Sequence, residues 1–339
     1  MMTGGRGRRE KNRKAKNVNR KEIQRVGRGA FRVLVCDLRF AFFAFFLLPP
    51  RNDPRMSTST PSKPYVLGTG DDELSRLGLQ HRLWSDAACD AWKRAGVGIG
   101  SRVLDVGCGP GFASFDLAQL VTPGGAVVGV DESAPFIDYL NGQAAARGLS
   151  QLSGAVHDVQ KLADVMLPGG PFDAAYARWV LCFVADPGAV VAGVASQLRS
   201  GAAFVIHDYF AYAGMTTAPR SEAHDVLVAA TAASWRSRGG DPDIVGRLPA
   251  LLIKNGFEVR HMQVHQRMAR GGVREDGTRD PMLGWPLTWW RTFAPKLVAM
   301  GSITQLQCDE ALSELASVER DETRFIVCPP VYEVVARKR

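Results

Sequence analysis

The stretch DVGCGPG at residues 105–111 combines a carboxylate with three closely spaced glycines. The apolar run RVLDV leads into it and predicts a β-strand, so the glycines would form the turn at the strand's carboxyl end. In open α/β sheets such a turn lets the backbone approach a cofactor closely, because glycine has no side chain and adopts positive φ readily. Asp105 lies on the strand itself and would add a negative charge. The stretch therefore predicts a cofactor site in which a carboxylate takes part.

The spacing of the glycines separates two kinds of cofactor. A dinucleotide-binding turn has the pattern G-x-G-x-x-G, which would require glycine at position 112. This chain has Phe112, and its glycines follow G-x-G-x-G. An NAD(P)-dependent oxidoreductase on a similar sheet stays open as the weaker alternative.

The pattern VLDVGCGPG, with its acidic residue on the strand, resembles the first motif of the class I S-adenosylmethionine-dependent methyltransferases. The chemistry of the cofactor accounts for the difference from a dinucleotide site. S-adenosylmethionine has no pyrophosphate for a helix N-terminus to hold, whereas its α-amino group and sulfonium are cationic and favour a carboxylate. The resemblance implies that Asp105 serves the amino-acid end of the cofactor, and that Gly107, Gly109 and Gly111 form the turn around it.

Further stretches follow in the order of the family's motifs, over residues 102–209. VVGVDES ends a predicted strand in Asp131, twenty residues beyond Gly111, the offset at which an acid accepts hydrogen bonds from ribose hydroxyls. In the alternative interpretation Asp131 only caps the following helix. The resemblance implies additional cofactor contacts from Glu132, from Asp158 and Val159 near the adenine, and from Arg178 beside the methyl donor.

Catalysis of methyl transfer from a sulfonium depends mainly on holding the acceptor atom close to the methyl carbon and in line with the breaking bond. A general base is needed only where the acceptor does not lose its proton easily. His207 and Asp208, at the end of the predicted strand 202–208, are the candidates, with Tyr209 as a pocket hydroxyl. In the alternative interpretation these residues only hydrogen-bond neighbouring loops.

Two histidines raise the question of a metal. His261 and His265 lie four residues apart on a predicted strand and would face the same side of it. The sequence offers no further ligand beside them, and we expect no metal site.

The segment GWPLTWWRTFAP, residues 284–295, concentrates aromatic side chains. They could stack on a flat substrate or stabilise a sulfonium by cation–π attraction. Packing of an insertion against the sheet is the alternative, and we favour it.

Short apolar runs alternate with helical patterns from residue 98 to residue 210, which predicts parallel βαβ units. We expect an α/β fold with a doubly wound, mostly parallel seven-stranded sheet and helical insertions after strands 5 and 6. The methyltransferase domain would span residues 64–339, with its cofactor half at 98–210. The insertions, at 211–248 and 271–325, would cover the substrate.

The net charge of +8 comes from the beginning of the chain. Residues 1–55 contain fifteen Lys/Arg and four Asp/Glu, whereas the rest contains 27 and 30, a net of −3. We therefore expect residues 1–63 to form a disordered basic extension. Its one apolar run is too short to span a membrane. Organelle targeting by this extension is possible beside a cytoplasmic location. The acidic body and the absence of a basic stripe disfavour nucleic acid.

The sequence as a whole favours methyl transfer to a small organic molecule. YARWVLCF lacks the Asn/Asp-Pro-Pro-aromatic element of many DNA and protein-amide methyltransferases, and the flanking stretches resemble the ubiquinone and menaquinone biosynthesis group. A methyltransferase-like protein without turnover is a further alternative. The accepting atom, O, N or C, and the oligomeric state stay open.

Overall fold

The computed structural model describes residues 70–339, and in this part the apolar runs form a seven-stranded sheet in the order β3-β2-β1-β4-β5-β10-β7. Within this sheet β10 runs antiparallel to β5 and β7, and the other strands are parallel. The predicted doubly wound, mostly parallel sheet is confirmed, while the extension expected over residues 1–63 lies outside the described residues. The strands are β1 (Arg102–Val106), β2 (Ala126–Asp131), β3 (Leu152–Val156), β4 (Phe172–Arg178), β5 (Leu198–Tyr209), β7 (Phe257–His265) and β10 (Val331–Lys338).

The central strands are buried on both faces, as their continuous Val, Ala and Leu runs require. In β1 successive side chains point to opposite faces, so Val103 joins one hydrophobic core, and Leu104 and Val106 join the other. Asp105 therefore shares the face of Val103. The alternation of the strand thus buries a carboxylate beneath the helices of that face.

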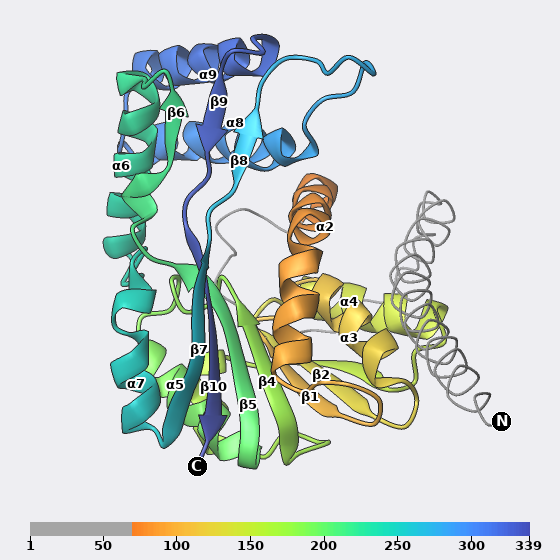
Figure 1. The fold of residues 1–339 in the computed structure, drawn as a ribbon. Helices are drawn as coiled ribbons and strands as arrows, with labels where there is room; N and C mark the ends of the chain where they lie inside the picture. Colours follow the sequence, from red (N-terminus) through yellow and green to blue (C-terminus); the bar gives the residue numbers. More distant parts are fainter. Residues whose placement is uncertain (1–69) are drawn as a thin grey trace, which may run out of the picture. The chain divides into compact units, whose positions relative to one another are not determined.

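Helices cover both faces of the sheet (Figure 1). The core on the Val103 face includes side chains of α2, α3 and α4, and the opposite core includes those of α5 and α7. Helix α2 has acidic residues in its first turn and basic residues in its last, an arrangement that suits the helix dipole. These helices are α2 (Asp71–Arg94), α3 (Phe112–Val121), α4 (Ala134–Ala146), α5 (Pro187–Gln197) and α7 (Leu248–Lys254), with the 3₁₀ turns η1 (Val159–Asp164) and η3 (Ile244–Gly246).

Strand β5 starts earlier than the sequence predicts. The sequence suggests a helical stretch over 186–201 and a strand over 202–208, but the helix ends at Gln197 and β5 begins at Leu198. Leu198 pairs with Phe172 at the start of β4, and a register shift follows in β4. Pairing with the neighbouring strand thus overrides the helical pattern of these residues.

The segments that follow β5 and β7 meet in a cap, defined as β6, α6, β8, α8, α9 and β9. Figure 1 shows the cap at one end of the seven-stranded sheet. This is the carboxyl end of the parallel strands, because Val331, just after the cap, pairs with Tyr209 at the end of β5. A three-stranded antiparallel sheet, β6-β9-β8, joins the two segments and was not expected. The elements are η2 (Tyr212–Gly214), β6 (Thr216–Ala218), α6 (Glu222–Arg236), β8 (Met268–Arg270), η4 (Pro281–Leu283), α8 (Gly284–Ala299), α9 (Gln305–Arg320) and β9 (Phe325–Val327).

Among residues 70–339, no helix combines the length and apolar content needed to cross a membrane. The five cysteines in the same range are all unpaired.

Two glycines of the turn after β1 have positive φ but differ in the space around them. Gly111 precedes α3 with φ 85°, and a Cβ there would lie 2.6 Å from Leu140 Cδ1 of α4. Gly109 has φ 55°, but a Cβ there would meet nothing within 4 Å. Gly111 is therefore needed for packing and Gly109 for an open approach to the turn.

The Gly111→Ala substitution should destabilise the chain by roughly 2 to 3 kcal/mol, because left-handed backbone and overpacking both disfavour a Cβ there. Gly109→Ala, the matched control, should cost about 1 kcal/mol from the backbone alone. Urea unfolding of the full chain measures both, and equal losses would contradict the packing role of Gly111.

Candidate active site

A cavity of about 420 Å³ opens at the carboxyl ends of the strands, beneath the cap. Its volume lies within the usual range for small-molecule sites. Residues that end β1, β2 and β4 or directly follow β3 line one part of it, and residues of β5, α6 and α8 line the other. Because β4 lies between β1 and β5 in the sheet, its last residues separate the two parts.

The glycine turn forms the floor of the first part. Gly107, Gly109 and Phe112 line the cavity, whereas Gly111 does not. The Gly109 N–H donates to Asp131 Oδ2 at 2.9 Å, which ties the turn to the end of β2. The structure therefore brings together two of the three predicted glycines at the cavity and assigns the third to helix packing.

Asp105 lines the cavity although it is only 3% exposed. Ser114, in the first turn of α3, donates to Asp105 Oδ2 at 2.6 Å. Burial raises the pKa of Asp105 from 3.8 to about 6, although the Ser114 hydrogen bond and the charge of Arg178 act in the opposite direction. At neutral pH this site holds a desolvated negative charge that a cation would stabilise.

The other predicted acids of the first part also reach the cavity, together with Val159. Asp131 accepts hydrogen bonds from the backbone N–H of Ser133 and of Gly109, both at 2.9 Å. Burial raises its pKa, and these two hydrogen bonds lower it. The residue before α4 is Ser133, so Asp131 is not the N-cap of that helix. Asp158 does cap η1, where it accepts from the Gln160 N–H, and Glu132 lies on the exposed rim.

Arg178 and Trp179 mark the boundary between the two parts. The Arg178 Nη2 atom lies 3.0 Å from His81 Nδ1, whereas its Nη1 atom is buried and has no hydrogen-bond partner among the described residues. Trp179 has φ 54°, a strained value for a bulky residue and one that clusters at functional sites. Its ring stacks near Trp285 and Tyr209. The end of β4 thus offers a cationic donor and an aromatic surface to the cavity.

The second part of the cavity is aromatic. Trp285, Trp289 and Phe293 of α8 line it, whereas the neighbouring Trp290 is fully buried. The packing interpretation favoured from the sequence accounts for Trp290, but it misses the three side chains that face the cavity. The other aromatic lining residues are Phe183, Tyr209, Tyr212 and Trp235.

The structure separates the two candidates for a general base, His207 and Asp208, from Tyr209, the predicted pocket hydroxyl. Tyr209 lines the cavity, but His207 and Asp208 do not. Asp208 accepts from the Cys182 and Tyr209 backbone N–H groups, so it holds the loop after β4. His207 lies on the opposite face of β5 and contacts Tyr176 and Glu333. Both side chains are buried and lie outside the cavity lining.

Several residues that line the cavity were not predicted from the sequence. Arg76 and Gln80 come from α2, where Arg76 donates to both Glu73 oxygens and to Gln80 Oε1. The Arg76 guanidinium lies 5.6 Å from the Trp289 ring centre. The sequence does show two polar residues four positions apart, Arg76 and Gln80, in a helix that is otherwise packed. Their local pattern, however, does not show which part of the fold they face.

The sequence comparisons agree with this geometry. Residues 99–238 match the family described as a methyltransferase domain. Nocamycin O-methyltransferase of Saccharothrix syringae is 40% identical over 100 residues, which cover 30% of this chain and 35% of that protein. The 2-phytyl-1,4-naphtoquinone methyltransferase of Synechococcus elongatus is 36% identical over 140 residues, which cover 41% of this chain and 56% of that protein. The chain thus spans between about a third and just over half of the length of these curated relatives.

A solved structure with a similar arrangement is geranyl diphosphate C-methyltransferase from Streptomyces coelicolor in complex with S-adenosyl-L-homocysteine. It is 16% identical, with a TM-score of 0.47 over 76% of this chain and 79% of that one. Residues 99–238 thus belong to a methyltransferase domain, and the order of the motifs and of the strands agrees with the class I S-adenosylmethionine-dependent methyltransferases, which confirms the resemblance seen in the sequence.

The buried carboxyl of Asp105 predicts a pH-dependent stability. Its pKa rises on folding, so the folded chain binds its proton more tightly, and ionisation destabilises the fold as the pH passes from 4 to above 6. Asp105→Asn keeps the acceptor for Ser114 and removes the charge. It should stabilise the ligand-free chain at pH 7.5 by on the order of 1 to 3 kcal/mol, and by less at pH 5.

Urea unfolding at the two pH values measures this difference. Asp90→Asn is the control, since the Asp90 side chain is 69% exposed and lies in a surface ion pair. If the Asp105→Asn variant is less stable than the unmodified chain at pH 7.5, the charge of Asp105 does not destabilise the fold.

Proposed function

We propose that this chain transfers a methyl group from S-adenosylmethionine to an oxygen of a flat, largely apolar small molecule. The observation that supports it most is a cavity that joins buried carboxylates and a glycine turn on one side to an aromatic wall on the other. The two parts meet at the end of β4, where a donor and an acceptor bound on either side would face each other.

The residues of the first part fit the cofactor's functional groups. The desolvated Asp105 carboxylate suits the α-amino group, and the unpartnered Nη1 atom of Arg178 suits the carboxylate of the same amino-acid end. Asp131 keeps acceptor capacity for ribose hydroxyls, Asp158 lies at the adenine end, and the open approach to Gly109 leaves room for the ligand. Glu132 and Val159 would complete the adenosine contacts.

The bound cofactor supplies a methyl group on a sulfonium, a good leaving group. The contribution of the chain is then to exclude water and to hold the acceptor in line with that methyl. Trp179, Tyr209 and Trp285 form an aromatic wall. Aromatic side chains of this kind bind a flat ring system by stacking on it. Trp289 and Phe293 extend the same surface.

Because no described residue that lines the cavity near the aromatic wall is a strong base, only some acceptor groups would react there. Among the described residues that line the cavity there is no histidine or lysine. Burial raises the pKa of Tyr209 well above its ordinary value, so its hydroxyl stays protonated and acts as a hydrogen-bond donor. An acceptor that ionises by itself near neutral pH, such as an acidic phenol, enol or carboxylic acid, fits these surroundings. The nocamycin relative is an O-methyltransferase, which supports oxygen as the acceptor atom.

The alternative functions have less support. The Phe112 ring lies at the position of a dinucleotide glycine and itself lines the cavity, which disfavours a nicotinamide coenzyme. A binding protein without turnover would not need an aromatic wall beside the cofactor's methyl. We further propose that the enzyme acts in the cytoplasm, since its five described cysteines are free thiols.

Incubation of the full chain with labelled S-adenosylmethionine and a panel of phenols, enols and aromatic acids tests this function. We expect label in an organic product and a methyl ether or ester on its mass spectrum. Stabilisation by NAD(P)H in place of S-adenosylhomocysteine, or tight cofactor binding with no labelled product, would contradict it.

Two variants should separate the parts of the cavity. Asp105→Asn should weaken S-adenosylhomocysteine binding at least tenfold, because the buried cation loses its counter-charge. Trp289→Ala should leave that affinity within about threefold and raise KM for the acceptor about tenfold or more. Calorimetry and steady-state kinetics distinguish the two effects, and loss of cofactor affinity in both variants would show that the cavity is not divided as described.

A further inference from the structure

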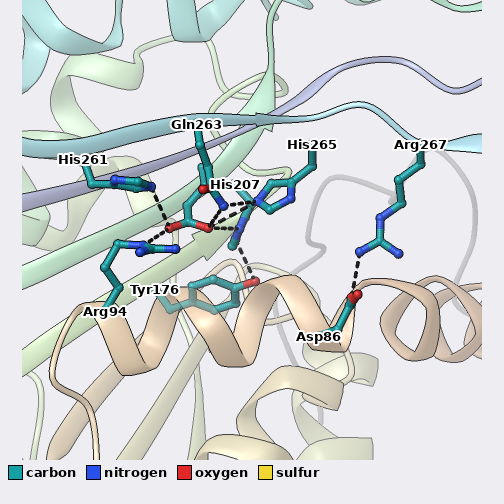
Figure 2. Close-up of polar contacts among 9 residues, drawn as sticks. Asp86, Arg94, Tyr176, His207, His261, Gln263, His265 and Arg267 are labelled. Atoms are coloured by element: carbon teal, nitrogen blue, oxygen red, sulfur yellow. Dashed lines mark hydrogen bonds and ion pairs between the residues drawn. The ribbon is translucent and has the colours of Figure 1, made fainter.

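A polar row crosses the sheet on the face covered by α2. Backbone register places His207 of β5 opposite Glu333 of β10, and Glu333 opposite Gln263 of β7. His265 lies two residues further along β7. Figure 2 shows His207, Gln263 and His265 converging from the strands, with Arg94 of α2 approaching from the helix. Alternating side chains of three neighbouring strands thus concentrate imidazoles around one carboxylate.

The carboxylate of Glu333 is fully buried and uses its two oxygens differently. Arg94 Nε donates to Oε1 at 2.9 Å, and His261 Nε2 lies 3.7 Å from the same oxygen. The Nε2 atoms of His265 and His207 lie 3.2 Å and 3.7 Å from Oε2. One oxygen of Glu333 therefore accepts from Arg94, and the other faces two imidazoles.

His207 is the part of this cluster that its protein contacts leave incomplete. Its ring is 1% exposed, and its Nε2 atom has no hydrogen-bond partner among the described residues, since 3.7 Å to Glu333 is too long. Its Nδ1 atom lies 3.4 Å from the Tyr176 hydroxyl. The Nε2 atom is therefore a buried ligand atom that faces a carboxylate without a hydrogen bond, while the other ring nitrogen is held by Tyr176. Metal-binding histidines are likewise held through the ring nitrogen that does not bind the ion.

We propose that His207, His265 and Glu333 form a binding site for a divalent transition-metal ion of the Zn²⁺ type. Their three ligand atoms lie within 4.8 Å of one another. Ligands at about 2.0 to 2.1 Å around a tetrahedral ion would lie about 3.3 Å apart, so a small contraction brings them into place. Two imidazoles and a carboxylate suit Zn²⁺ or Co²⁺ better than Mg²⁺ or Ca²⁺, which prefer oxygen.

Gln263 and Arg94 complete the surroundings of the ion. Gln263 Nε2 lies 3.0 Å from Glu333 Oε2 and 3.1 Å from His265 Nε2, so a half-turn of the amide would present its oxygen as a fourth ligand. Arg94 is 39% exposed and binds the other carboxylate oxygen, where solvent screens its repulsion of the ion.

The ion would have a positioning role rather than a place in methyl transfer. His207 touches Tyr176, which lines the cavity, and pairs in the sheet with Arg178 at the end of β4. An ion on His207 would thus fix β5, β7 and β10 to one another and hold Tyr176 beside the cofactor half. The site does not depend on the proposed methyl transfer.

Metal titration of the full chain, without a histidine tag and after treatment with a chelator, tests the proposal. We expect one tight equivalent of Zn²⁺ by calorimetry, visible absorption of imidazole-bound Co²⁺, and a higher melting temperature with either ion. His265→Ala should weaken binding roughly tenfold or more and abolish the thermal shift. The side chain of His265 is partly exposed, so this variant should fold, and S-adenosylhomocysteine binding checks that it does.

His261→Ala is the matched control, since His261 lies on the same face of β7 but faces the other carboxylate oxygen. It should keep the metal affinity, and Glu333→Gln should lose it. No saturable binding to the unmodified chain, or equal binding by His265→Ala, would overturn the proposal and leave the cluster as an ion-pair network.

Discussion

The burial of the Asp105 carboxylate is the constraint around which this molecule is arranged. Strand alternation turns the side chain beneath α2 and α3, where only the Ser114 hydroxyl and the charge of Arg178 offset its desolvation. Such a group destabilises the empty fold and gains most from a bound cation. The glycine turn, which keeps side chains away from the same region, makes the position accessible. The proposed affinity for a cationic cofactor and the cost to stability therefore have one origin.

The rest of the cavity follows from the sheet order. Parallel strands end at one edge, so β1, β2 and β3 bring their acids together there, and β5 places Tyr209 on the far side of β4. The cap closes this edge with the aromatic face of α8. Because β6, β8 and β9 pair across segments that are distant in the chain, a sheet joins the two segments of the cap that carries α8. The two parts of the cavity are thus positioned by separate elements that meet at Trp179.

The sequence was informative where the pattern was local. The strands up to β5, the glycine turn and the acids at strand ends could be predicted because each depends on a few consecutive residues. The cap sheet could not, since Thr216–Ala218 and Phe325–Val327 are three residues long and far apart. The same limit hid the partners of His265, because His207 and Glu333 reach it only through strand register, and it made His207 look like a residue of the active-site edge.

A crystal structure of the full chain with S-adenosylhomocysteine would show directly how the cavity binds its ligand. We expect the amino-acid end of the ligand between Asp105 and Arg178, the ribose hydroxyls on Asp131, and the sulfur directed past Trp179 toward the aromatic wall. A ligand bound in the reverse direction, with its adenine against α8, or bound outside this cavity, would contradict the proposed arrangement of the two parts.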